Sequence, residues 1–347
     1  MTSIILIAIL FLLIVQCSIM VYLLVSKIKR NRIVRKKEEL KEKLIPLVDQ
    51  FVQEKRDNNM IVTTNEVELE VLEEILNEYA LLVNLETSLA RINDFAEFTL
   101  KNKYQRLLQS NKWSSRMNAL YFIEDFNMKS LSDLVYEPLN KEGAIILDEE
   151  MKQRFRTLAT LQDERIVKDV FRISNGASSF YKEIFRKYNE LLFQLQTEMI
   201  TNQSTVSALS GLLGVIGEKR DFAYYPFVEK LLLHEDSELR VQALKAILQY
   251  EYMSDPDKLT QFLMSPHWPE RMIATKIVGN LRLNRFKKSL IDLVKNDAEW
   301  WVQFSASEAI SKFEDGEFIL GHMRESLPRS KAAIVDQWVE KGEIGNA

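Results

Sequence analysis

Few residues of this 347-residue chain have the types and spacing that chemistry requires. His234, His267 and His322 are the only histidines, and their separations of 33 and 55 residues match no metal-ligand motif. The single cysteine, Cys17, lies in an apolar segment far from all of them. We therefore expect neither a metal centre nor a cysteine nucleophile.

Two other patterns resemble chemical motifs but have structural explanations. Gly211, Gly214 and Gly217 lack the Lys-Ser/Thr pair that completes a phosphate-binding loop, and they lie in an apolar segment. The acidic pairs at 149–150 and 163–164 fall where helices are expected to begin, and the helix dipole favours acidic residues there. The sequence therefore predicts no catalytic residue, no cofactor and no small-molecule substrate.

A long apolar run lies near the amino terminus. Residues 4–25 carry no charged side chain, and at about 1.5 Å per residue they would span roughly 33 Å as a helix, enough to cross a bilayer core. A cleaved signal peptide is the weaker interpretation, because no basic residue precedes the run and the run is long for a signal peptide. The sequence predicts a single-pass membrane anchor over residues 1–26.

Seven basic residues, the basic collar, follow this run directly: Lys27, Lys29, Arg30, Arg32, Arg35, Lys36 and Lys37. Because no basic residue precedes the run, the positive-inside rule places the amino terminus outside the cell membrane and the body in the cytoplasm. The collar is expected to act mainly as a topology signal, with anionic lipid headgroups as an alternative ligand. The formal charge of the chain is −4, so the part outside the collar carries −11, and nucleic acid is not an expected partner.

The rest of the chain is expected to be all-α. Ten glycines and seven prolines are few for this length, and both residue types interrupt helices. Apolar residues recur with helical spacing, and one long helix is expected over 177–199. The compact, helix-rich chain fits a bacterial origin.

Four segments are predicted along the chain. Residues 1–26 form the anchor, 27–60 the basic collar and a helical stalk, 61–200 a helical domain that could hold degenerate repeats, and 201–347 a repeat domain. We expect the part that begins near Asn65 to fold without the anchor.

The predicted stalk carries an apolar stripe with the spacing of a coiled coil: Leu40, Leu44, Leu47 and Phe51. Two heptads are too short to indicate a dimer, and packing onto the protein's own body is slightly favoured. Pro46 predicts a kink or a new helix within this stretch.

The last third of the chain repeats itself with a period of 31 or 32 residues. Ala243, Ala274 and Ala306 occupy the same place in three similar segments, and an apolar helix and a short turn precede each segment. A fixed period of two helices is typical of an α-solenoid.

These segments resemble the HEAT repeat, whose second helix commonly begins with an acidic turn and carries an arginine three residues before an alanine. Arg240 with Ala243 fits well; in the second copy Glu270 stands where an apolar residue is usual, and in the third Gln303 replaces the arginine. Arg116 with Ala119 is a candidate degenerate copy. The resemblance covers about residues 221–313 and implies a right-handed α-solenoid of HEAT-like helix pairs after the anchor.

Exposed aromatic residues are typical of protein interfaces. Trp300 and Trp301 point about 100° apart on a helix, so both are not expected to be buried against one neighbour. Packing of both indoles between consecutive repeats is an alternative with at least equal support. The predicted protein-binding surface combines three tryptophans with second-helix polar residues: Trp268, Trp300, Trp301, Gln242, Lys245, Lys276 and Gln303.

The leading functional hypothesis is a non-enzymatic, membrane-tethered scaffold that binds a protein partner at the cytoplasmic face. A second hypothesis is an accessory subunit of a membrane enzyme that makes or exports an envelope polymer. A third is a HEAT-like enzyme, because some HEAT-like proteins act on DNA bases or attach chromophores. The basic groove or nucleophile usual in such enzymes is not visible in the sequence.

Overall fold

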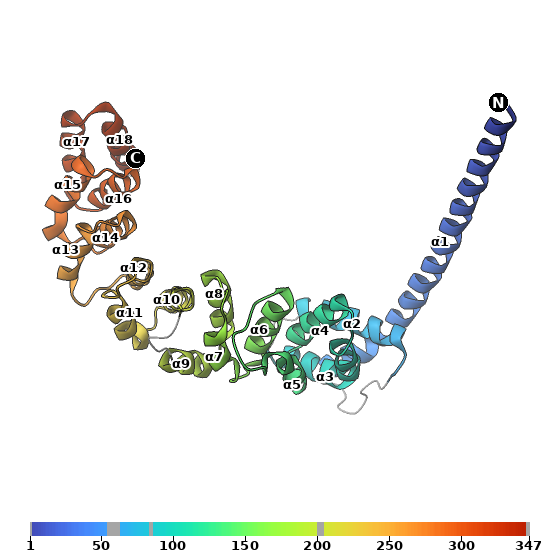
Figure 1. The fold of residues 1–347 in the computed structure, drawn as a ribbon. Helices are drawn as coiled ribbons and strands as arrows, with labels where there is room; N and C mark the ends of the chain where they lie inside the picture. The colour runs from blue at the N-terminus through green and yellow to red at the C-terminus, as the bar shows by residue number, and fades with distance from the viewer. Residues whose placement is uncertain (1, 54–62, 83–85, 200–204, 345–347) are drawn as a thin grey trace. The chain divides into compact units, whose positions relative to one another are not determined.

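The computed structural model describes residues 2–53, 63–82, 86–199 and 205–344. Within these ranges the chain forms eighteen α-helices joined by turns and short 3-10 helices (Figure 1). The extended pairing found in these ranges is one isolated bridge between Ile145 and Ile173. The all-α prediction is therefore confirmed, and the helices pack as sequential pairs in a HEAT-like manner.

The chain divides into two compact units. The first comprises Met1–Lys141 and Glu149–Asp163, and the second comprises Glu142–Asp148 and Glu164–Ala347. The predicted segment boundaries at 60/61 and 200/201 lie outside the described residues, and the boundary at 26/27 falls inside one continuous helix.

That helix, α1 (Thr2–Val52), dominates the first unit. It continues through Pro46, where the sequence predicted a kink or a new helix. Between residues 11 and 36 every side chain is exposed, whereas Leu44, Val48 and Phe51 are buried near its carboxyl end. One helix therefore carries both the predicted span and the predicted stalk.

The carboxyl end of α1 packs on α2 (Glu66–Leu82) and α3 (Glu86–Leu108). The Phe51 ring lies 5.0 Å from the Phe95 ring of α3, and Arg91 of α3 donates to the Phe51 carbonyl at 3.2 Å. The apolar stripe thus packs onto the protein's own first unit, although Leu47 remains 38% exposed. The first unit continues with α4 (Trp113–Asp125), α5 (Ser132–Tyr136) and α6 (Glu149–Leu161), of which α4 packs between α3 and α6.

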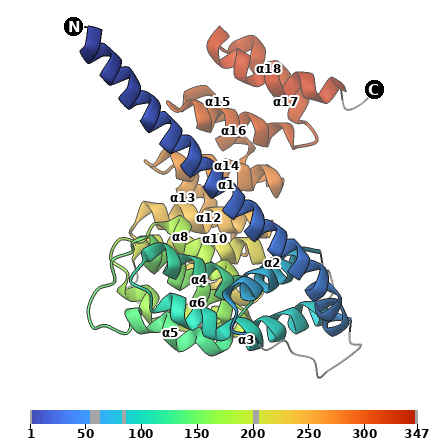
Figure 2. The same ribbon diagram turned by 90° about the vertical axis from the view of Figure 1, so that its right-hand side faces the viewer.

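In the second unit the larger helices pack in chain order, each against the next (Figures 1 and 2). This row consists of α8 (Ser178–Lys187), α10 (Val206–Lys219), α12 (Ser237–Tyr250), α14 (Trp268–Asn280), α16 (Trp300–Ser311) and α18 (Arg329–Ile344). Before α8 lies α7 (Ile166–Asp169), and between successive members lie α9 (Glu190–Met199), α11 (Tyr225–Leu231), α13 (Leu259–Leu263), α15 (Lys287–Asn296) and α17 (Gly316–Ser326). We call the members of the row second helices, because each follows a shorter first helix in its repeat.

The long helix expected over 177–199 is in fact two helices. The backbone becomes extended at Tyr188, and the Asn189 side-chain oxygen accepts the Leu192 amide at 2.9 Å. A side-chain cap of this kind satisfies a free amide at the start of a helix, so a new helix, α9, begins here.

A left-handed backbone conformation recurs just after five of the larger helices. It occurs at non-glycine residues, with φ between 48° and 61°: Asn127, Gln162, Arg220, Glu251 and Arg282. Glu251 and Arg282 each lie eight residues after a repeat alanine, Ala243 or Ala274, and Asn127 lies eight residues after Ala119. The same backbone feature therefore recurs after α4 in the first unit, next to the candidate degenerate copy around Ala119.

The packing of α1 changes the expectation for the isolated body. A fragment that begins at Asn65 lacks Leu44, Val48 and Phe51 and therefore exposes the apolar faces of α2 and α3 that they cover. We expect a fragment of residues 36–347 to be soluble, monomeric and more stable to heat than a fragment of residues 65–347.

Circular dichroism during heating and size-exclusion chromatography would measure the difference between the two fragments. Equal melting temperatures and equal solubility would show that the end of α1 contributes nothing to the core.

Candidate partner-binding surface

Small residues let neighbouring second helices approach closely. A Cβ atom on Gly279 of α14 would lie 2.7 Å from the Ala309 Cα atom of α16, and one on Gly217 of α10 would lie 3.1 Å from the Ala246 Cα atom of α12. The repeat alanines Ala243, Ala274 and Ala306 are fully buried. Larger side chains at these places would force the helices apart, so the alignment of the row depends on them.

The arginines of the repeat link each second helix to its own turn and to the following repeat. Each donates to the backbone carbonyl six residues earlier: Arg116 to Ser110 at 2.9 Å, Arg240 to His234 at 2.8 Å, and Arg271 to Ser265 at 2.7 Å. Gln303 makes the equivalent bond to the Asp297 carbonyl at 2.6 Å. The shared geometry identifies Arg116 as a member of the same series.

The same arginines also pair with a carboxylate of the next repeat. Arg240 pairs with Glu270 at 2.7 Å and Arg271 with Asp297 at 2.7 Å in the second unit. In the first unit, Arg116 pairs with Glu150 at 2.7 Å. These arginines are structural links, as is usual for the corresponding residue of a HEAT-like repeat.

Glu270 explains a departure from the HEAT pattern. It is 2% exposed and occupies a place where an apolar residue is usual. Its carboxylate forms an ion pair with the Arg240 guanidinium and accepts a hydrogen bond from the Ser265 hydroxyl at 2.5 Å. Glu150 occupies the matching first turn of α6, where hydrogen bonds from Arg116 and then Arg154 hold the pKa of its carboxyl below the usual value.

The three predicted tryptophans are all partly exposed. Trp268 is 37%, Trp300 44% and Trp301 54% exposed. Trp268 and Trp300 are the first residues of the adjacent helices α14 and α16. The Trp300 ring lies 4.7 Å from the Trp301 ring in an edge-on arrangement and stacks on the Phe304 ring at 5.0 Å. Trp300 and Trp301 therefore form one rigid, half-exposed aromatic group.

The predicted polar residues divide into two groups. Lys245 is exposed and Gln242 and Lys276 are half-buried; Lys245 and Lys276 lie two residues after successive repeat alanines, on neighbouring helices. Gln303 is 7% exposed and its amide is engaged by the Asp297 carbonyl. It therefore does not belong to an accessible surface.

A groove between successive turns was missed by the sequence reasoning. It has a volume of about 430 Å³ and lies between the turn before α12 and the turn before α14. Leu233 and Met264 line it and are 67% and 80% exposed. They lie ten residues before Ala243 and Ala274, so the 31-residue period could have revealed them as equivalent turn residues.

The exposed apolar residues at the starts of the second helices together define what we call the turn edge: Leu233, Met264, Trp268, Trp300 and Trp301. All five lie in, or at the first residues after, the turns that lead into α12, α14 and α16. Leu233 and Met264 line one groove, and Trp300 and Trp301 contact each other. Exposed apolar and aromatic residues of this kind are typical of protein-binding sites.

Comparisons with known proteins identify no family. No protein-family model matches the chain, and no curated protein matches it. An engineered protein of known structure aligns with 84% of this chain and 81% of its own length, at 15% identity and a TM-score of 0.33. The complex of CpcE and CpcF of phycocyanin lyase from Nostoc sp. PCC7120 aligns with 69% of this chain and 92% of that chain, at 15% identity and a TM-score of 0.28. At these TM-scores neither likeness carries a conclusion about function.

The buried ion pair that supports this surface makes a testable prediction. Arg240→Ala should lower the free energy of unfolding by about 3–5 kcal/mol, because it leaves the Glu270 carboxylate buried without its cation. The double change Arg240→Met with Glu270→Leu should recover most of that loss, since a well-packed apolar pair can replace a buried ion pair. Chemical denaturation of residues 36–347 would measure both values.

Arg186→Ala provides the matched control. Arg186 and Glu218 also join successive second helices, but their side chains are 54% and 35% exposed. Loss of a solvent-exposed pair should cost far less than loss of the buried pair, because water and salt screen its charges. Equal costs for Arg186→Ala and Arg240→Ala would contradict a special role for the buried link.

Proposed function

We propose that this protein is a non-enzymatic, membrane-tethered scaffold that binds a protein partner at the cytoplasmic face. The observation that carries the proposal is the continuity of α1, which has an exposed apolar part and a buried end in the core of the first unit. The fold it tethers is HEAT-like, and such repeats present extended surfaces to partners. We also propose the right-handed solenoid form that is usual for this repeat.

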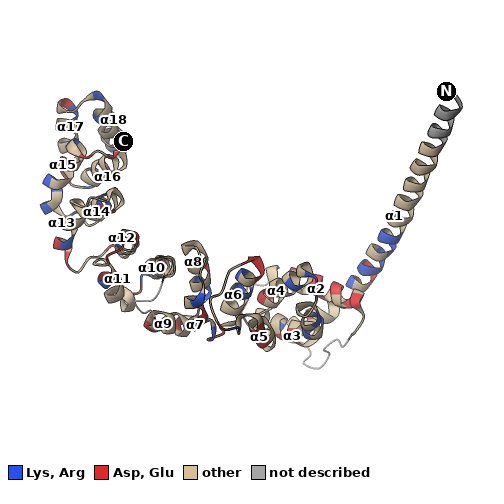
Figure 3. Cartoon of the chain, in the orientation of Figure 1, with Lys and Arg blue, Asp and Glu red and all other residues tan. Residues whose placement is uncertain are grey.

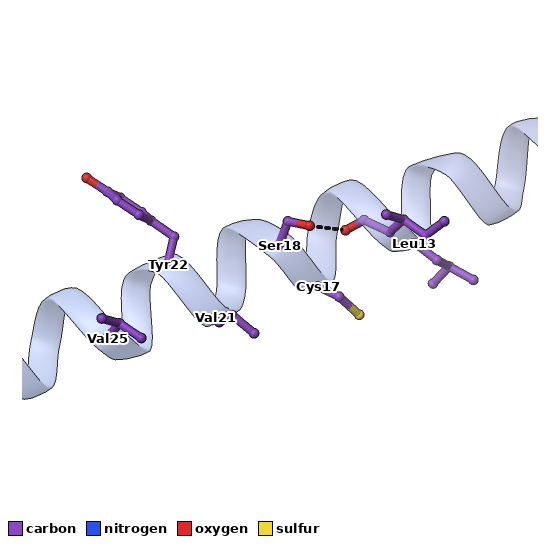
Figure 4. Close-up of a pocket in the computed structure, with 7 residues that line it drawn as sticks. Leu13, Cys17, Ser18, Val21, Tyr22 and Val25 are labelled. Atoms are coloured by element: carbon purple, nitrogen blue, oxygen red, sulfur yellow. Dashed lines mark hydrogen bonds between the residues drawn. The ribbon is translucent and has the colours of Figure 1, made fainter.

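The apolar part of α1 has the properties of a membrane span. Among the described residues it is the one helix long and apolar enough to cross a bilayer. Leu13, Val21 and Val25 line one flank of it in Figure 4, and the large apolar side chains from Phe11 to Val25 are exposed. The hollow drawn there is lined by α1 alone, so it is the open flank of a helix and not a ligand cavity.

The polar groups of this segment fit an apolar surrounding. The Ser18 hydroxyl donates to the Ile14 carbonyl at 2.8 Å, so its hydrogen is satisfied within the helix. The basic collar then follows on the carboxyl side, as Figure 3 shows. This order supports an outside amino terminus and a cytoplasmic body in a cell membrane.

A second candidate function is an accessory subunit of a membrane enzyme, for example one that makes or exports an envelope polymer. Within the described residues, α1 joins the apolar run to the first unit without a flexible linker. This rigid connection favours an accessory subunit over a tether for soluble partners. Only about twelve residues, roughly 18 Å of helix, separate Val25 from Lys37, where the contacts with α2 begin. A first unit held at a fixed height suits a partner that is fixed in the same membrane.

The proposed topology can be measured with a single cysteine. In a Cys17→Ser background, Lys245→Cys introduces one exposed thiol on α12 of the body. We expect it to resist a membrane-impermeant thiol reagent in intact cells and to react after lysis. Ready labelling in intact cells would reverse the proposed orientation.

Partner capture should depend on the turn edge. We expect the double variant Trp268→Ser and Trp301→Ser to lose most of the protein crosslinked to the wild type in native membranes. The expected loss is at least tenfold, because exposed tryptophans at an interface often contribute 2 kcal/mol or more.

Trp113→Ser is the matched control for this experiment. Trp113 is 54% exposed, as Trp301 is, and it is the first residue of α4 in the first unit. It should leave both capture and melting temperature near wild type. If the double variant captures the same proteins at the same yield, the turn edge is not the binding surface.

A further inference from the structure

The basic collar surrounds α1 on all sides. At about 100° per residue, the six basic residues between positions 27 and 36 leave no angular gap wider than about 100° around the helix axis. All six side chains are exposed: Lys27, Lys29, Arg30, Arg32, Arg35 and Lys36. A helix lying on a membrane surface would carry its charges on one face, whereas a ring of charge fits a helix that emerges from a bilayer.

The first members of the ring lie at the height of lipid phosphates. Counted from Val25 at about 1.5 Å per residue, Lys27, Lys29 and Arg30 lie roughly 3 to 7.5 Å beyond the apolar run. The headgroup layer on one side of a bilayer is roughly 5–7 Å thick. Arg35 and Lys36 lie roughly 15 Å out, beyond direct reach but within about one Debye length of that layer.

Lys37 differs from the other members of the collar. Its amino group pairs with Glu70 at 3.0 Å and with Glu74 at 2.9 Å, and the hydrogen bonds that it donates to Glu74 and then to Glu70 raise its pKa. Lys41 makes a similar contact with Glu78 at 2.6 Å. The acidic face of α2 thus binds the basic residues farthest from the membrane.

The membrane-proximal basic residues have no such protein partner. Within the described part of the chain, no ion pair engages Lys27, Lys29, Arg30 or Arg32, whereas Arg35 pairs with Glu39 at 3.1 Å. A concentration of cations at phosphate height attracts anionic lipid.

We propose that the collar binds the phosphate headgroups of anionic phospholipids and gathers them around α1. This inference rests on the proposed membrane anchor, and it names the ligand of the basic collar that follows the anchor. Arginine and lysine donate charge-assisted hydrogen bonds to phosphate oxygens. Lys27, Lys29 and Arg30 project in three different directions from the helix axis, so more than one headgroup can bind at once.

The test uses the full-length protein in vesicles and a reporter next to the collar. Tyr22 is 71% exposed and lies three residues before Val25, so Tyr22→Trp places an indole at the edge of the acyl chains. Quenching of this indole by brominated phosphatidylglycerol is compared with its quenching by brominated phosphatidylcholine. The protein that keeps Tyr22 is measured in the same vesicles, and its signal gives the contribution of the other tryptophans.

We expect the relative binding constant for lipid next to the Tyr22→Trp indole, obtained from the quenching, to be about threefold or more higher for phosphatidylglycerol than for phosphatidylcholine. The double variant Lys29→Gln and Arg30→Gln should remove most of this preference. Arg35→Gln with Lys36→Gln removes the same charge farther from the membrane and should reduce the preference much less. High salt should weaken the preference in the unsubstituted collar.

The possible results separate the two proposals. Equal quenching by the two lipids would overturn lipid selection and leave the anchor intact. An equal loss in both double variants would show that only total charge matters, which contradicts binding at the headgroup layer. No quenching by either lipid would overturn the anchor itself, and lipid binding with it.

Discussion

The close approach of neighbouring second helices is the constraint on which the second unit depends. A single helix pair leaves an apolar face uncovered until the next pair packs on it. In this chain that packing requires very small residues, because the Gly279 and Ala309 backbones nearly touch and Gly217 lies against Ala246. Once these contacts set the spacing, the turns before α12, α14 and α16 fall into register and bring the turn edge together.

Polar links stabilise the same register from the ends of the helices. The arginine of one repeat binds its own turn and a carboxylate of the next repeat, so it joins three segments with one side chain. Since a buried carboxylate without a cation is costly, the Arg240 and Glu270 pair favours one alignment of α12 and α14 over shifted ones. Gln303 replaces the arginine in the third copy, and its uncharged side-chain amide donates the equivalent hydrogen bond to its own turn.

The first unit solves a different problem with α1. The end of a helical repeat needs a cover for its last apolar face, and Leu44, Val48 and Phe51 of α1 supply it for α2 and α3. The same helix continues without interruption to the apolar run and the collar. Covering the core and carrying the proposed anchor are therefore properties of one helix, and a change in its length would alter both.

The sequence by itself determined the all-α class, the apolar run with its collar, and the helix pairs around Ala243, Ala274 and Ala306, because composition and periodicity are local properties. Helix geometry left two interpretations of Trp300 and Trp301 open, one with a partly exposed indole and one with both indoles packed between repeats, and the tertiary structure leaves both partly exposed. Only the tertiary structure decided that Gln303 is buried, that Glu270 has a cation, and that Leu233 and Met264 border a groove. Each of these depends on a neighbouring repeat, and a single sequence shows the residues of that neighbour without the distance between them.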